Sequence, residues 1–120
     1  MILALGGDDA IKSFGGDDLV CSGSGKDTVR SGGGGDLVFG DQQADLLLGQ
    51  GGDDRLRGSA GSDEILGSSG DDSLKGQAGG DELFGERGDD GLEGGPGNDE
   101  CDGGAGKDTG IGCNVKREIP

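Results

Sequence analysis

Histidine, tryptophan and tyrosine are absent from this 120-residue chain, and aromatic residues make up only 2% of it. Without histidine, and with no base beside its serines, the sequence offers no catalytic constellation. Large side chains that could fill a core are also few, because glycine accounts for 32 residues. Each glycine that becomes ordered loses more conformational entropy than any other residue. The composition therefore argues against an ordinary globular core, and we expect this chain not to be an enzyme.

Basic residues are scarce, since 10 lysines and arginines face 25 aspartates and glutamates, for a formal net charge of −15. A chain this acidic repels nucleic acid and anionic membrane surfaces, and it attracts cations. Hard divalent cations prefer carboxylate and carbonyl oxygens, which aspartate and a glycine-rich backbone both supply. Low hydrophobicity with high net charge is also typical of disordered segments, so composition alone leaves an unstructured chain open.

Long apolar runs are missing as well. None approaches the length of a membrane-spanning helix, and residues 1–5 are too short and have no basic start for a signal peptide. We therefore expect no membrane span. The negative net charge described above likewise predicts no nucleic-acid partner.

What the chain does contain is a nine-residue period. An aspartate occupies every ninth position, twelve times in succession: Asp9, Asp18, Asp27, Asp36, Asp45, Asp54, Asp63, Asp72, Asp81, Asp90, Asp99 and Asp108. A glycine stands two residues before each of these aspartates, with Gln43 as the exception. An apolar residue or cysteine stands two residues after all but the last: Ile11, Val20, Val29, Val38, Leu47, Leu56, Ile65, Leu74, Leu83, Leu92 and Cys101. Disordered low-complexity sequence has no reason to keep three columns in phase.

From Gly40 onward a further glycine opens each unit, which gives the consensus G-G-x-G-x-D-x-U-x, where U is a large apolar residue. Over residues 6–109 this pattern resembles the hemolysin-type calcium-binding nonapeptide repeat of the RTX family. The resemblance implies an all-β fold: a right-handed parallel β-roll, or β-helix solenoid, of about six coils with two repeats per coil. We expect a calcium-binding repeat array over residues 1–109 and a non-repeat tail or cap over residues 110–120.

Each unit is expected to divide into a six-residue turn and a three-residue strand whose central side chain points inward. One inner face should hold Ile11, Val29, Leu47, Ile65, Leu83 and Cys101. The other should hold Val20, Val38, Leu56, Leu74 and Leu92. These side chains bury too little apolar surface to offset the entropy of ordering the chain, so folding needs a further source of free energy.

Calcium is the expected source. In the family the ion lies between loops two units apart, so all twelve aspartates of the column are predicted ligands, together with turn carbonyls. Twelve loops allow at most ten sandwiched calcium sites, from the Asp9–Asp27 pair to the Asp90–Asp108 pair. Magnesium fits less well, because it demands tighter octahedral geometry and keeps its waters. A second set of acids either tunes the field of the sites or faces solvent: Asp8, Asp17, Asp53, Asp71 and Asp89.

Two departures from the pattern give expectations of their own. Gln43 replaces a turn glycine, so the two sites that use the Asp45 loop are expected to be weak or empty. Leu48, Leu66 and Phe84 should point outward in one line and form either a docking stripe or a chance alignment.

Three cysteines remain outside the consensus. A disulfide between Cys101 and Cys113 would tie the tail over the open end of the roll and would agree with an oxidising extracellular setting. Two buried free thiols are the alternative. Cys21 should face outward and stay unpaired, either free or in an intermolecular bond.

These observations predict a secreted, extracellular calcium-binding module that folds when it meets calcium outside the cell, as part of an exported RTX-like protein. Ile2 already stands in the inward column, so the chain begins in mid-repeat and is expected to be a piece of a longer array or of a larger exported protein. Two alternatives stay open. One is a calcium-rigidified spacer or adhesive arm of a surface protein, and the other is the C-terminal module of a secreted enzyme whose catalytic domain lies elsewhere.

Overall fold

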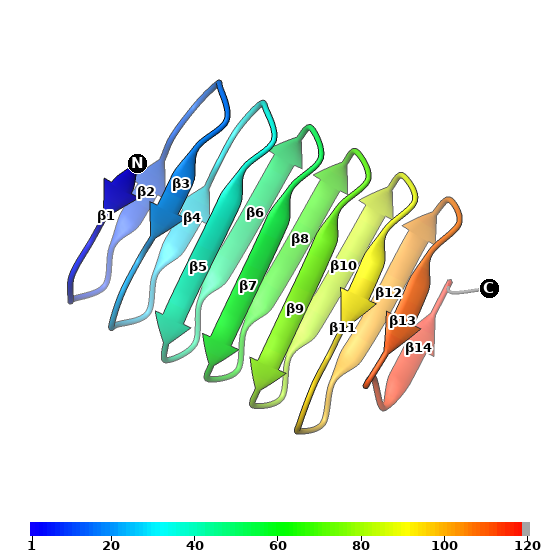
Figure 1. Cartoon of the computed structure of the whole chain (residues 1–120). Coiled ribbons are helices and arrows are strands. Elements are labelled where there is room, and N and C mark those ends of the chain that lie inside the picture. The colour runs from blue at the N-terminus through cyan, green and yellow to red at the C-terminus, as the bar shows by residue number, and fades with distance from the viewer. Residues whose placement is uncertain (119–120) are drawn as a thin grey trace.

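A computed structural model describes residues 1–118, and this part of the chain consists of strands and turns without any helix. The strands alternate between two layers as the chain advances (Figure 1). The odd sheet contains β1 (Ile2–Leu3), β3 (Leu19–Cys21), β5 (Leu37–Gln42), β7 (Arg55–Ala60), β9 (Ser73–Ala78), β11 (Gly91–Glu93) and β13 (Thr109–Ile111). The even sheet contains β2 (Ala10–Lys12), β4 (Thr28–Arg30), β6 (Leu46–Gly51), β8 (Glu64–Ser69), β10 (Glu82–Arg87), β12 (Glu100–Ala105) and β14 (Val115–Arg117).

Every strand pair is parallel, and the register places equivalent repeat positions beside one another. Val38 pairs with Val20 on one side and with Leu56 on the other, which are the residues eighteen positions away along the chain. One coil therefore consumes two nonapeptide units. The expected parallel β-roll of about six coils is confirmed.

The core is a single layer of side chains between the two sheets. All eleven residues predicted to point inward are buried, with exposed fractions of 8% for Ile11 and 2% or less for the others. Alternation along each strand produces this layer, because only the central residue of each apolar triplet faces the opposite sheet. The predicted inner faces are thus confirmed.

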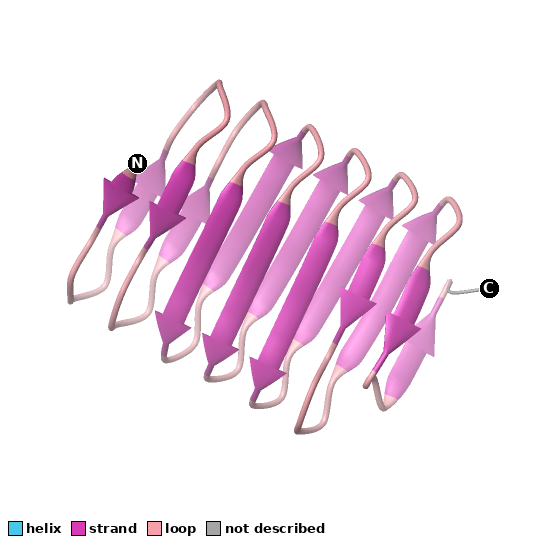
Figure 2. Cartoon of the chain, viewed as in Figure 1, coloured by secondary structure: helices cyan, strands magenta, loops and turns pink. Residues whose placement is uncertain are grey.

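Strand length differs from the three residues expected. The strands β5 to β10 and β12 each span six residues, because the first turn residues continue to pair with the next coil, as Asp41 does with Ser59. The three-residue length holds for β2, β3, β4 and β13, and for β11, where Pro96 has no N–H to extend the ladder. Figure 2 shows that the remaining turns gather along the two long edges of the roll.

The outward residues of the even sheet also align as expected. Leu48 pairs with Leu66 and Leu66 with Phe84, and all three side chains are half-buried. Their role in docking stays a prediction.

The core layer can be probed at two adjacent residues that face opposite ways. Ile65→Ala should lower the free energy of unfolding by about 2–5 kcal/mol, because it removes buried methyl groups and leaves a cavity in a one-residue-thick core. Leu66→Ala, on the half-buried outer face, should cost less than about 1 kcal/mol. Urea unfolding in saturating calcium measures both values, and equal losses would contradict the assigned inward and outward faces.

Candidate metal centre

The twelve aspartates of the nine-residue column form two rows, one along each edge of the roll. One edge carries Asp9, Asp27, Asp45, Asp63, Asp81 and Asp99, and the other carries Asp18, Asp36, Asp54, Asp72, Asp90 and Asp108. From Asp27 onward each of these side chains is only 1–3% exposed, whereas Asp9 and Asp18 at the first coil are half-buried. A column of buried carboxyl groups is unusual, because a buried charge is costly unless it is paired.

From Asp27 onward, one oxygen of each carboxyl group in the column is satisfied by the backbone. The N–H of Asp45 donates to Oδ1 of Asp63 at 2.9 Å, and the N–H of Asp63 donates to Oδ1 of Asp81 at 2.8 Å. The same bond recurs along both edges from Asp9 to Asp108. The structure therefore brings together the aspartates that the sequence paired two units apart.

The other carboxyl oxygen has no partner. Oδ2 is buried without a hydrogen bond in eleven aspartates: Asp18, Asp27, Asp36, Asp45, Asp54, Asp63, Asp72, Asp81, Asp90, Asp99 and Asp108. Within the described residues these are also the only buried side-chain polar atoms without a partner. Buried polar groups are normally hydrogen-bonded, so an Oδ2 atom without a partner that recurs from turn to turn requires an explanation.

At several of these atoms a second oxygen lies close by, across the gap between coils. A methyl group built on Gly40 would lie 2.5 Å from Oδ2 of Asp45 and 2.9 Å from the carbonyl oxygen of Gly58 in the next coil. Glycine at position 40 leaves this space free, and Gly49 and Gly85 leave the same space beside their own aspartates. Two oxygens that converge without a donor fit a hard cation, and calcium accepts this mixture of carboxylate and carbonyl ligands.

Side chains alone do not complete such a centre. Among residues 1–118 no group of three or more aspartate, glutamate, cysteine or histidine side chains is arranged to hold a metal ion. A cation between coils must therefore take main-chain carbonyls as well, as the glycine-rich turns allow.

The first coils fill the same space differently. Ser22 donates its hydroxyl to the carbonyl oxygen of Gly40 at 2.9 Å, and Ser31 donates to that of Gly49 at 3.0 Å. Ser13 makes the equivalent bond to Ser31 at 2.6 Å. In these gaps the carbonyl oxygen that would face a cation already accepts a hydrogen bond from a neutral hydroxyl group. The sequence carried this signal, because a unit-opening glycine first occurs at Gly40.

Burial also changes the acidity of the column. Desolvation, reinforced by the neighbouring carboxylates, raises the pKa of Asp45 and of Asp54 from 3.8 to about 7, although the backbone hydrogen bond lowers it in part. The same causes raise the pKa of Asp63 and of Asp72 to about 6. Without a cation, therefore, ionising these groups near neutral pH opposes folding.

The second set of acids lies on the solvent side of the turns. Asp53, Asp71 and Asp89 follow one another along one edge, and each accepts the N–H of the residue eighteen positions later. Their side chains are exposed, and the charges of Asp53 and Asp71 also contribute to the raised pKa of Asp72. These three acids therefore face solvent and also lie close enough to act on the buried column, whereas Asp8 and Asp17 are seen only to face solvent.

The Asp45 turn keeps the common geometry despite its glutamine. Gln43 takes the left-handed conformation, with φ of 73°, where glycine stands in the other units. That conformation costs a non-glycine residue on the order of 1 kcal/mol. Asp45 nonetheless makes the same backbone bonds as its neighbours and is 3% exposed, so weaker metal binding at this loop stays a prediction.

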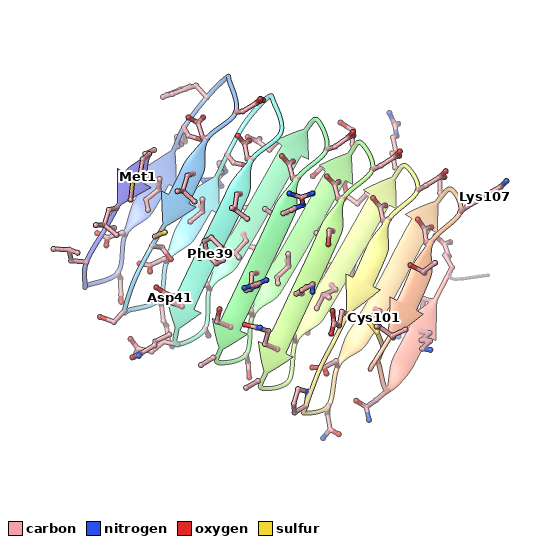
Figure 3. All side chains as sticks on the ribbon, in the orientation of Figure 1. Met1, Phe39, Asp41, Cys101 and Lys107 are labelled. Carbon is pink, nitrogen blue, oxygen red and sulfur yellow. A yellow bond between two sulfur atoms is a disulfide. The ribbon has the colours of Figure 1, made fainter. Side chains whose placement is uncertain are left out.

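The cysteines follow the predicted pairing. Cys101 and Cys113 form a disulfide with 5.9 Å between their Cα atoms, which rules out the alternative of two buried thiols. Figure 3 shows Cys101 towards the C-terminal end of the roll. Cys21 is a half-buried free thiol on the outside of the odd sheet.

The raised pKa values predict how the calcium-free chain responds to pH. Carboxyl groups with a raised pKa in the fold favour folding fully below about pH 4, and this contribution is lost as the pH rises through 6 to 7. We expect the calcium-free chain to show more β structure by circular dichroism at about pH 5 than at about pH 8.

Two adjacent substitutions test the cause of that response. At about pH 8, Asp54→Asn should increase the β signal of the calcium-free chain, because it removes a buried charge, while Asp53→Asn on the exposed side should change it far less. An identical β signal at the two pH values would contradict this account.

Comparison with known proteins agrees with this geometry. The family model described as the RTX calcium-binding nonapeptide repeat matches four times, over residues 1–29, 30–65, 57–92 and 76–109. No curated protein matches the chain. No helix in residues 1–118 is long and apolar enough to cross a membrane. The repeats cover most of the sequence and bind calcium in this family, so the chain belongs to the RTX calcium-binding nonapeptide repeat family and is a calcium-binding repeat module.

Proposed function

We propose that this chain is a folding switch operated by calcium, in which the aspartates of the two turn rows are the metal ligands. The observation that carries the proposal is the column of buried Oδ2 atoms without hydrogen-bond partners. A cation between successive coils would satisfy each Oδ2 together with the carbonyl oxygen that faces it across the gap. The ten sandwiched pairs from Asp9–Asp27 to Asp90–Asp108 are the candidate sites.

The ten gaps are not equivalent. Six of them combine an unpartnered Oδ2 with a unit-opening glycine, and their first aspartates are Asp45, Asp54, Asp63, Asp72, Asp81 and Asp90. The other four have a serine or alanine in place of that glycine: Ala4, Ser13, Ser22 and Ser31. We expect calcium to bind more tightly in the glycine-opened gaps than in the three gaps with Ser13, Ser22 and Ser31, because the serine hydroxyl already satisfies the facing carbonyl there.

Calcium would offset two obstacles to folding: the cost of burying the carboxyl charges, and the small amount of apolar surface that the core buries. The carboxyl groups lose their hydration and repel one another, while the core between the sheets is only one layer of side chains. In a compartment poor in calcium the chain would remain extended, a state suited to export. Calcium outside the cell would then condense the roll, and family resemblance supports this secreted, extracellular setting.

The direct test is circular dichroism during a calcium titration. The β signal should develop cooperatively with calcium and disappear when a chelator is added, because the ions supply the free energy that the core lacks. Magnesium at the same concentration should not replace calcium, since it demands stricter octahedral geometry. A β signal at neutral pH that persists in chelator would refute the switch.

A single methyl group tests the placement of the ions. Gly85→Ala should weaken calcium binding in the Asp90 gap by at least about tenfold, because the new Cβ would occupy the space between Oδ2 of Asp90 and the carbonyl oxygen of Gly103. Gly33→Ala is the matched control, since a Cβ there has no atom within 4 Å. Isothermal titration calorimetry compares the two variants, and equal affinities would place the ions elsewhere.

A further inference from the structure

The tail after the last repeat adds one more layer to the even sheet. The strand β14 pairs in parallel with β12, and Val115 stands beside Glu100. Within the array, partners in adjacent coils are eighteen residues apart, but the bond that joins the tail to the last coil spans fifteen. The tail thus imitates a turn of the array with three residues fewer, a feature that the nine-residue period does not predict.

Asn114 takes the place of an aspartate in this shortened turn. Asp99 donates its N–H to Oδ1 of Asn114 at 2.8 Å, as Asp81 donates its N–H to Oδ1 of Asp99 at 2.9 Å. The amide oxygen therefore reaches back to the preceding coil in the same way as the carboxylate oxygens of the column. Asn114 differs from them in being neutral.

The facing pair of oxygens is also present at this gap. Oδ2 of Asp99 is buried and has no hydrogen-bond partner. A methyl group built on Gly94 would lie 2.7 Å from this oxygen and 2.5 Å from the carbonyl oxygen of Gly112. The arrangement repeats that at Gly40, where Oδ2 of Asp45 faces the carbonyl of Gly58, with the tail now in the place of the next coil.

The disulfide holds the two tail residues that contribute these oxygens. Cys113 lies between Gly112 and Asn114 in the sequence, and it is bonded to Cys101, two residues after Asp99. The backbone N–H groups of Asn114 and Val115 both donate to the carbonyl of Asp99, at 2.9 and 3.1 Å. The tail is thus fixed covalently and by hydrogen bonds across the gap.

We propose that Asp99, Gly112 and Asn114 form a further calcium site, closed by the tail and held by the Cys101–Cys113 disulfide. It lies beyond the ten sandwiched pairs and rests on the proposed function, that calcium occupies the gaps between coils. The asparagine oxygen carries no net charge, so this site binds calcium more weakly than a glycine-opened gap between two aspartates. Its occupancy depends on the oxidised state of the disulfide.

The experiment is a count of bound ions by equilibrium dialysis with radioactive calcium, on the full chain carrying Cys21→Ser so that reduction acts on one bond only. Asn114→Ala should remove one bound ion from the weaker class. Asn98→Ala, an exposed asparagine beside Asp99 whose side chain makes no hydrogen bond, should remove none. Asn114→Asp should increase the affinity of the site for that same ion by about tenfold, because it places a carboxylate at this position.

Reduction separates a site held by the disulfide from general loosening of the tail. A dithiol reductant should remove one ion from the parent chain and none from Asn114→Ala, because the two changes abolish the same site. Equal ion counts in Asn114→Ala, Asn98→Ala and the parent chain would overturn the proposal, as would an additional ion lost when Asn114→Ala is reduced. A parent chain that binds no calcium would instead refute the proposed function.

Discussion

The fold depends on how one carboxylate oxygen per turn is satisfied. From Asp27 onward, each aspartate of the column uses Oδ1 to accept a backbone N–H from the preceding coil, and its Oδ2 is buried where no donor reaches it. An ordinary protein would compensate for such buried charge with a large core, but here the core is one layer of aliphatic side chains and a half-cystine. The free energy of this roll is therefore governed by the species that occupies the gaps between coils, whether a cation, a proton or a serine hydroxyl.

The choice between a cation and a serine hydroxyl in each gap accounts for where glycine and serine open the repeat units. Glycine at positions such as Gly40 leaves room beside Oδ2, and a Cβ would fill it. In the first coils, Ser22 and Ser31 fill the corresponding space and donate to the facing carbonyls, so these gaps need a cation less. If calcium occupies the gaps as proposed, the array should depend on metal less in the hydroxyl-closed gaps of the early coils than in the open gaps that follow.

The sequence predicted most of the fold because the period of nine fixes the phase of every column. Once two units are assigned to a coil, the buried positions of residues such as Leu56 and Cys101 follow from register. The Cys101–Cys113 disulfide was predicted as one of two alternatives, because Cys113 lies outside the repeat and its position does not follow from the period. The prediction of three-residue strands was wrong for the six-residue strands. Pairing of the first turn residues depends on local backbone conformation, which the consensus does not encode. The role of Asn114 was missed because the shortened tail moves it out of phase, so only the hydrogen bond from Asp99 reveals it.

The geometry also implies that the gaps do not act independently. A carboxyl group such as that of Asp63 bonds through Oδ1 to the coil before it, and its Oδ2 belongs to the gap with the coil after it. An ion that fixes this side chain in one gap therefore orders the acceptor on which the neighbouring gap depends. In a solenoid, where each coil contacts only its neighbours, such shared side chains couple adjacent interfaces. Binding should consequently spread along each edge from coil to coil, and a well-fixed end such as the disulfide-bonded tail is a favourable place for ordering to begin.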